Sequence, residues 1–271
     1  MLISIYKKYK KYLLFLFFFL QYLLFRQFIN REILPVYPIA HDQVIYLNQA
    51  FEIYKALQSL DLFELIRIFK SLSTGIFLQF LTGFLYLFFG PSREIALNIN
   101  FVFFTLLQLS LLRFSKVFLK SNLGFYFFVG LLLSLPSLFH IIGGIFDFRL
   151  DFAAFCLNFI ILLEILIFFY EKKRFKPILF VIALTVLFYL RTNLLIVYSV
   201  FFVFLLIFLF LTKKVFSSKS LIISFITTLI LAFPFVFVNF RNLYNYYYVG
   251  HIKGNEVIYR KAETNTFNKF D

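Results

Sequence analysis

Charged residues are scarce in this chain of 271 residues, and so are cysteine and tryptophan. Asp, Glu, Lys and Arg together make up only 15% of the sequence, whereas 62% is hydrophobic, including 46 Phe, and tryptophan is absent. A soluble core of this size cannot hide so much apolar surface, so the composition excludes an ordinary soluble globular protein. We therefore expect a polytopic membrane protein that lies in a lipid bilayer.

Cysteine and histidine are too few for the common disulfide and metal scaffolds. The one cysteine, Cys156, lies in an apolar run, which excludes a disulfide framework and a thiolate metal cluster. His41, His140 and His251 are isolated, without the i,i+4 spacing that turns two ligands to the same side. The sequence thus predicts no metal site of these types, and Cys156 is expected to be a small buried hydrophobe.

The amino-terminal segment indicates membrane insertion. "YKKYKKY" is a basic region, but the apolar run behind it is too long for the core of a signal peptide. It continues into "RQFINREIL" without a small-residue cleavage site. We expect an uncleaved signal anchor that is also the first transmembrane helix, with its amino terminus in the cytoplasm.

Hydropathy gives eight apolar segments, and the basic residues decide how many of them cross. If all eight crossed, the basic segment 171–176 would lie outside and the acidic segment 146–152 inside, against the positive-inside tendency. If 73–90 instead lies in the interface or re-enters, the cytoplasmic loops collect fourteen basic residues against one acidic residue, Glu171. We therefore expect an all-α transmembrane bundle of about seven spans. The eight segments are 12–34, 73–90, 97–114, 123–145, 152–170, 177–193, 194–211 and 220–239.

This topology defines the expected domains. Residues 1–240 form the transmembrane domain, with a first exoplasmic loop at 35–96, and 241–271 form an exoplasmic carboxy-terminal tail. The loop contains a segment after Asp42 with apolar and polar residues on opposite helical faces, and "DLFELIRIFKSL" is a candidate for a second such segment. We expect amphipathic helices that lie along the membrane surface.

Three acids are expected on the exoplasmic side. Asp42 directly follows the first span, where the simplest role is that of an N-cap for the surface helix. Asp147 and Asp151 would share one helical face if the turn between them is helical, with Arg149 between them to offset their repulsion. A structural salt bridge is the simplest alternative for this second group.

Arg191 and Asn193, in "YLRTNLL", lie inside a continuous apolar stretch. Ionisable groups at membrane depth are costly, so a function is the default expectation for them. A guanidinium in such a place is stabilised by an anion, and phosphate suits its bidentate geometry.

The formal net charge of +14 does not indicate a nucleic-acid partner. The basic residues lie in short loops beside the spans, where orientation during insertion and attraction to anionic lipid head groups explain them. We expect no binding of nucleic acid.

The order of these segments resembles a known family. It runs from an uncleaved anchor, through "HD" at its outer end and a long loop of surface helices, to "PSREIALNINFVFF", "LSLPSLF" with "FDFRLDF", and "ALTVLFYLRTNLL". This pattern resembles the integral-membrane glycosyltransferases of the GT-C superfamily, which includes protein O-mannosyltransferases and aminoarabinose transferases. The likeness covers about residues 10–195, with an echo in 245–263. Members are usually longer, so it implies a reduced member or part of a longer chain.

The resemblance also implies roles for individual residues. The first exoplasmic loop of the family carries the acid taken to be the catalytic base, which points to Asp42, although "HDQ" stands here where an Asp-Glu pair is commoner. The acid of the second loop corresponds to Asp147 or Asp151, and both stay candidates. A cation must stabilise the departing phosphate, and Arg191 is the first choice. The other candidates for substrate binding are Arg149, Asn193, His251 and Arg260.

The implied activity is transfer of a sugar, with inversion, from a polyprenyl-phosphate-linked donor. The acceptor would be an envelope glycan, a lipid or a protein on the exoplasmic face of a bacterial cytoplasmic membrane. The implied reaction requires no cofactor. A divalent cation that bridges Asp42 and Asp147 or Asp151 stays a candidate, because some members of the family are metal-dependent.

Other classes also stay open. A polysaccharide polymerase or a flippase would handle the same polyprenyl carriers, and a transporter would use the same intramembrane charges, although inverted repeats are not visible. A subunit without activity is the plainest alternative. The sequence identifies neither the sugar and the acceptor nor the oligomeric state.

Overall fold

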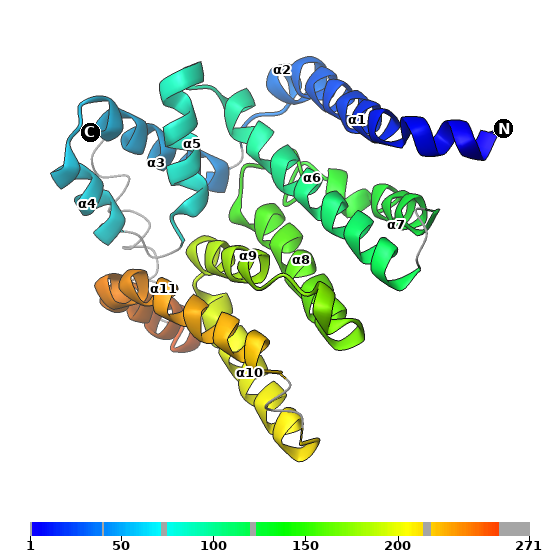
Figure 1. Cartoon of the computed structure of the whole chain (residues 1–271). Coiled ribbons are helices and arrows are strands. Elements are labelled where there is room, and N and C mark those ends of the chain that lie inside the picture. The colour runs from blue at the N-terminus through cyan, green and yellow to red at the C-terminus, as the bar shows by residue number, and fades with distance from the viewer. Residues whose placement is uncertain (1, 40, 72–74, 120–122, 214–217, 255–271) are drawn as a thin grey trace.

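The computed structural model describes residues 2–39, 41–71, 75–119, 123–213 and 218–254 (Figure 1). These residues form helices joined by short loops, and no strand occurs among them. The prediction of an all-α, polytopic membrane bundle is confirmed, and the apolar helices identify an integral membrane protein.

Five stretches are long and apolar enough to cross a membrane: Tyr12–Val36, Arg93–Phe118, Leu150–Tyr170, Asn193–Leu211 and Lys219–Gly250. They belong to α1 (Leu2–Phe28) with the π-helix η1 (Ile29–Ile33) and α2 (Leu34–Val36), to α6 (Arg93–Phe118), α8 (Leu150–Tyr170) and α10 (Asn193–Leu211), and to α11 (Lys219–Leu243) with the π-helix η5 (Tyr244–Ile252). The shorter elements are α3 (His41–Gln58), α4 (Leu62–Ser71), α5 (Phe77–Phe89), α7 (Leu123–Leu133), α9 (Pro177–Leu190) and the 3₁₀ helices η2 (Pro136–Phe139) and η3 (Lys172–Arg174).

Each of the eight predicted apolar segments contains a helix, but three of these helices are short. The 13 residues of α5 extend only about 20 Å, less than the roughly 30 Å of a hydrocarbon core. This length agrees with the expectation that the segment 73–90 does not cross. Because α7 and α9 are short as well, the count of seven spans stays a prediction.

The predicted span 123–145 is not one continuous helix. The helix α7 ends at Leu133, and η2 and a turn follow it. The cause is Pro136, whose ring disfavours the helical conformation at the preceding residue, and Leu135 is accordingly extended (φ −82°, ψ 108°). The chain therefore leaves its helix before it reaches the loop that carries Asp147.

The helix α8 forms the centre of the bundle. It packs against α6 and against α9, and α9 packs in turn against α11 (Figure 1). Residues on several sides of α8 are fully or nearly fully buried, among them Phe152, Cys156 and Ile161. A helix that is hydrophobic all round is expected in such a place, and Cys156 is the small buried hydrophobe that the sequence predicted.

Charged side chains mark two opposite ends of the bundle. We name one of them the Asp42 end. The helices α3, α8 and α10 begin there, and it contains Asp42 and Asp151. At the other, the Lys172 end, Arg113 of α6 pairs with Glu164 of α8. Glu164 lies 13 positions after Asp151, which corresponds to about 20 Å along α8. The structure thus places Asp151 and Glu164 towards opposite ends of α8. The division of the acidic and basic loops between the two sides of the membrane stays a prediction.

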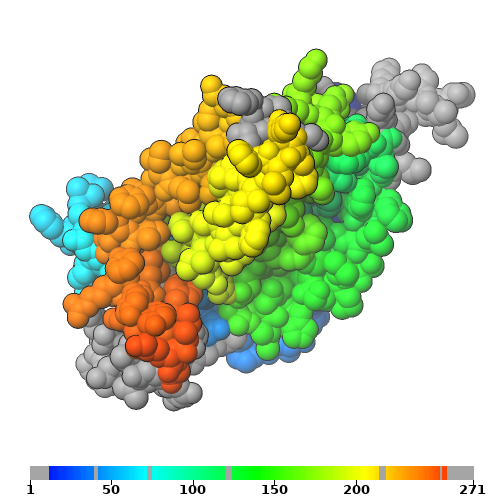
Figure 2. Space-filling view, turned by 90° about the horizontal axis from the view of Figure 1, so that it is seen from below, coloured from blue at the N-terminus to red at the C-terminus, as the bar shows by residue number. Residues whose placement is uncertain are grey.

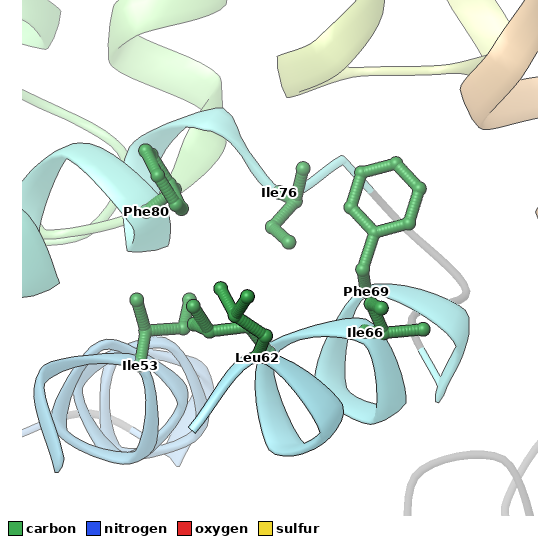
Figure 3. Close-up of a pocket in the computed structure, with 7 residues that line it drawn as sticks. Ile53, Leu62, Ile66, Phe69, Ile76 and Phe80 are labelled. Carbon is green, nitrogen blue, oxygen red and sulfur yellow. The ribbon is translucent and has the colours of Figure 1, made fainter. Parts of the chain in front are cut away.

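The expected surface helices correspond to α3 and α4. A glycine brings α3 close to α5, since a Cβ on Gly83 would lie 2.7 Å from the carbonyl oxygen of Ala50. The helix α4 faces both, around an apolar pocket of about 300 Å³, as Figure 3 shows. On the outer side of α4, Phe63 is 88% exposed, as expected of a helix that rests on a membrane. The residues lining this pocket are Ile53, Leu62, Leu65, Ile66, Phe69, Ile76 and Phe80.

Candidate functional site

Asp42 lies in the first turn of α3 and contacts the loop before α8. The Arg149 Nη1 donates a hydrogen bond to Asp42 Oδ2 at 2.9 Å, although 107 positions separate the two residues. Because α3 begins at His41, Asp42 is inside the helix, and the predicted N-cap role is wrong. The Asp42 side chain is 52% exposed, so its carboxylate is accessible.

Asp147 is the buried member of this group, with no exposed side-chain surface. Its Oδ1 accepts a hydrogen bond from Gln43 Nε2 at 2.6 Å, and its Oδ2 accepts from the Gly143 backbone N–H at 2.6 Å and from Arg149 Nε. A buried carboxylate is tolerated only when its charge and lone pairs are matched in this way. Since both oxygens are engaged, Asp147 is suited to hold Arg149 rather than to take a proton.

The guanidinium of Arg149 connects the two carboxylates. Burial lowers the pKa of Arg149, but the hydrogen bonds and charges of Asp147 and Asp42 outweigh this effect and leave the pKa raised. The side chain is 17% exposed and stays charged. Arg149 also occupies the position between Asp42 and Asp147 that a bridging divalent cation would need.

The loop that carries Asp147 is fixed by α6. Asn100, which is fully buried, donates from Nδ2 to the carbonyl oxygens of Ile145 at 3.1 Å and of Asp147 at 2.7 Å. The loop is also tightly folded, since a Cβ on Gly144 would lie 2.3 Å from the carbonyl oxygen of His140. These contacts leave Asp147 little freedom to move.

Asp147 and Asp151 do not share a helical face. The segment after Asp147 is not helical, because Arg149 is extended (φ −123°, ψ 161°) and α8 begins only at Leu150. The prediction that Arg149 lies between Asp147 and Asp151 is therefore correct for Asp147 and wrong for Asp151. Arg149 lies between Asp147 and Asp42, and Asp151 has a different partner.

That partner is Arg191, at the break between α9 and α10. Arg191 Nη2 donates to Asp151 Oδ1, so one anion beside this guanidinium is a carboxylate. The two side chains are 28% and 47% exposed, which leaves the pair screened by solvent and weak. The contact uses one of the two amino groups of Arg191.

Tyr46 of α3 lies close to both ion pairs. Burial raises the pKa of its hydroxyl, Arg191 lowers it, and Asp42 and Asp151 raise it. The raised pKa keeps the hydroxyl protonated at neutral pH. Because the charges of both pairs act on one hydroxyl, the two pairs belong to one region. We name it the Asp42 cluster, made of Asp42, Gln43, Tyr46, Asp147, Arg149, Asp151 and Arg191.

An apolar pocket of about 360 Å³ adjoins the Asp42 cluster, between the start of α10 and the end of α11 with η5. Figure 2 shows α10 in yellow beside α11 in orange, with η5 in red at one end of this face. Thr192 and Asn193, which directly follow Arg191, form the polar edge of the pocket. Their Oγ1 and Oδ1 atoms are buried and have no hydrogen-bond partner among the described residues. The other lining residues are Leu195, Ile196, Val236, Phe240, Leu243, Tyr244, Tyr247, Tyr248 and Ile252.

Two predicted substrate-binding residues lie outside the part of the chain that the structure describes. The side chain of His251 and the whole of Arg260 are not among the described residues. Within the described part, no group of three or more His, Cys, Asp or Glu residues is arranged to hold a metal ion.

Several residues of the site were not predicted. Gln43 donates a hydrogen bond to the side chain of Asp147, Asn100 donates to its carbonyl oxygen, and the charges of both ion pairs act on the hydroxyl of Tyr46. The signal for Asn100 was a polar residue inside an apolar helix, which is rare without a bonding role. For Gln43 and Tyr46, the only signal was their position next to Asp42 in sequence.

Comparison with known proteins gives no family assignment. No protein-family model, no curated protein and no solved structure matches this chain. The chemistry of the Asp42 cluster is therefore inferred from its geometry and from the resemblance of the sequence segments.

Proposed function

We propose that this protein is a membrane glycosyltransferase that moves a sugar from a polyprenyl-phosphate-linked donor to an acceptor at the Asp42 end of the bundle. The observation that carries the proposal is the contact between Asp42 and Arg149. It joins the acid after the first span to the acidic loop before α8. These are the two segments that the resemblance to GT-C glycosyltransferases singled out.

Asp42 is the proposed general base. Its carboxylate accepts the proton of an acceptor hydroxyl or amine while the oxygen or nitrogen of that group attacks the anomeric carbon of the sugar. The bond from the anomeric carbon to the phosphate oxygen breaks, and the polyprenyl phosphate leaves with the electron pair. The half-exposed position of Asp42 supports this role, and Arg149, held by buried Asp147, keeps the carboxylate in place.

Arg191 is proposed to stabilise the departing phosphate. Its contact with Asp151 uses only one amino group, and the remaining N–H donors suit phosphate oxygens. The apolar pocket that begins at Thr192 and Asn193 supports a donor with an isoprenoid chain, because such a chain needs an apolar surface next to the phosphate site.

The proposed side of the membrane follows from the charge bias. The loops of the Lys172 end carry most of the basic residues, which favours the cytoplasm for that end and the exoplasmic face for the Asp42 cluster. The proposed membrane is a bacterial cytoplasmic membrane.

The class of donor can be tested with the purified full chain in lipid vesicles. We would supply polyprenyl-phosphate mannose, polyprenyl-phosphate aminoarabinose or a nucleotide sugar, and measure release of polyprenyl phosphate or nucleotide. Release from a lipid-linked donor alone is expected. Ile196→Trp, which adds volume inside the apolar pocket, should raise the KM for that donor, whereas Phe204→Trp on the outer face of α10 should not.

Two results would contradict the proposal. Release of nucleotide from a nucleotide sugar would place the donor outside the bilayer. Movement of a polyprenyl-linked sugar across the vesicle without cleavage would make the protein a flippase, which is the alternative that shares its substrate chemistry.

A further inference from the structure

A third apolar cavity, of about 450 Å³, lies away from the Asp42 cluster. The helices α6 and α9 both pack against α8, and the cavity is lined by all three. Leu157 and Ile160 of α8 line it between the other two helices, and Phe77 and Leu81 of α5 contribute further apolar lining. We name this cavity the α6–α9 groove.

Several lining residues of the groove in α6 and α9 face outward, while others, such as Phe103 and Ala183, are buried. Val102, Leu106 and Leu109 of α6 are 53%, 44% and 41% exposed, and Ile182 of α9 is 56% exposed. These side chains lie within candidate spans or an apolar helix, so lipid rather than water surrounds them. The groove is therefore open to the hydrocarbon of the bilayer.

Positive charge is found among the lining residues only towards the Lys172 end. Arg113 of α6 and Lys176, just before α9, belong to the lining. Arg113 is engaged with Glu164 and with the carbonyl oxygen of Arg174. Lys176 is exposed, and its ammonium group makes no ion pair with the described residues. The adjoining η3 adds three cations, of which Arg174 pairs with Glu171, and positive charge exceeds negative charge at this mouth of the groove.

The length of the groove matches one leaflet. From Val102 to Arg113 the helix α6 rises about 16 Å, close to half of the roughly 30 Å hydrocarbon thickness. A lipid chain that lay along it would place its head group beside Arg113 and Lys176. Basic sites between transmembrane helices at the charged side of a bundle are suited to anionic head groups.

We propose that the α6–α9 groove binds one acyl chain of an anionic phospholipid from the leaflet at the Lys172 end, with the phosphate held by Lys176 and Arg113. We expect an anionic lipid because the excess positive charge attracts its head group more strongly than it attracts a zwitterionic head group. The site is independent of the proposed sugar transfer, because its cations and the Asp42 cluster lie at opposite ends of α8.

The absence of tryptophan from the sequence allows a direct test. Leu106→Trp introduces one tryptophan into the groove, seven residues before Arg113. Phe204→Trp is the matched control, because Phe204 is a lipid-facing residue of α10, 67% exposed and seven residues before Leu211 at the same end. Each variant of the full chain is placed in phosphatidylcholine vesicles that contain a minor fraction of dibrominated phosphatidylglycerol, and quenching of the fluorescence is measured.

The expected result is preferential quenching of the tryptophan in the groove. The apparent affinity for phosphatidylglycerol should be about fivefold higher at Leu106→Trp than at Phe204→Trp, a factor typical of one cation at an anionic surface. Adding Lys176→Gln should remove this preference. Adding Lys213→Gln, which deletes a cation of the same end outside the groove lining, should leave it.

Three results would overturn the site. The first is equal quenching of the two tryptophans by dibrominated phosphatidylglycerol. The second is quenching of Leu106→Trp by dibrominated phosphatidylcholine that equals its quenching by dibrominated phosphatidylglycerol. The third is no quenching of Leu106→Trp, which would show that protein covers the groove. The unaltered chain supplies a second measurement. Native mass spectrometry should detect retained phosphatidylglycerol that Lys176→Gln loses, and equal retention by both would overturn the proposal as well.

Discussion

At the scale of single residues, the two carboxylates bound to Arg149 differ in what surrounds them. Asp147 has no exposed side-chain surface and engages both oxygens, whereas the Asp42 side chain is half exposed and pairs with Arg149 alone among the described residues. A group that must exchange a proton with a substrate has to be reached by that substrate. This difference separates the proposed base, Asp42, from the residue that positions it.

Asp147→Asn is expected to destabilise the fold. The amide would place an N–H group opposite the donors of Gly143 or Gln43 and would leave Arg149 without its buried counter-charge. Breaking a buried pair from one side typically costs about 3–5 kcal/mol. Thermal unfolding of the purified chain should show a clear loss of Tm, while Asp42→Asn should leave the Tm nearly unchanged. Equal Tm values for wild type and Asp147→Asn would show that the hydrogen bonds around Asp147 do not contribute as described.

Arg191→Ala is expected to weaken use of the lipid-linked donor. Arg191→Lys should recover part of the activity, because an ammonium keeps the charge but loses the bidentate geometry. The measurement is the KM for a polyprenyl-phosphate sugar. Arg67→Ala is the control, since it also removes an arginine from an exposed ion pair, with Glu64 in α4. Full activity in Arg191→Ala would move the phosphate site elsewhere, with the carboxy-terminal tail as the next candidate.

At the scale of elements, the irregular parts of the helices lie mainly at the Asp42 end. The π-helical segments η1 and η5 lie near the ends of the first and last long stretches, and the break between α9 and α10 carries Arg191. Such π-helical segments occur often at functional sites, because they redirect side chains that a regular helix would place elsewhere. The apolar pocket beside Arg191 includes residues of η5, which agrees with this use.

Gly83 is expected to control the position of α3, and with it that of Asp42. Gly83→Ala would bring a Cβ within 2.7 Å of the Ala50 carbonyl oxygen, so α3 has to shift away from α5. We expect a lower Tm and a reduced rate of sugar transfer. Gly130→Ala in α7 is the matched control, since its Cβ would meet nothing within 4 Å and a helical alanine is favoured over glycine by about 1 kcal/mol. A Gly83→Ala variant as stable and active as Gly130→Ala would show that the close approach is not needed.

At the scale of the whole molecule, local patterns predicted the helices but not their partners. The apolar runs of α6, α8 and α10 follow from hydropathy alone, and the end of α7 follows from Pro136 once its effect on Leu135 is considered. The pairing of Asp42 with Arg149 could not be predicted, because it depends on how α3 is placed against the loop before α8. Sequence spacing suggested Asp151 as the second partner of Arg149, but the extended Arg149 backbone turns the two acids apart.

The orientation of the bundle is open to a labelling test. With Cys156 replaced by Ala, a cysteine introduced by Ser59→Cys should react with an impermeant reagent from outside the cell, and one introduced by Lys219→Cys should react only after permeabilisation. Both positions are exposed, Ser59 in the predicted exoplasmic loop and Lys219 at the start of α11, which is predicted to lie on the cytoplasmic side. The reason for the expectation is the excess of basic residues at the Lys172 end. The reverse pattern of labelling would place the Asp42 cluster in the cytoplasm.

The rate of sugar transfer by Asp42→Asn tests the central proposal most directly. Asparagine keeps the size of the side chain and can still accept the hydrogen bond of Arg149, but it cannot take a proton. We predict that insertion and Tm stay near those of wild type while the rate falls by about 10² to 10⁴, the usual contribution of a general base. Asp61→Asn, at an exposed acid whose carboxylate caps α4, should retain full activity. Near wild-type turnover by Asp42→Asn would contradict the assignment of Asp42 as the base.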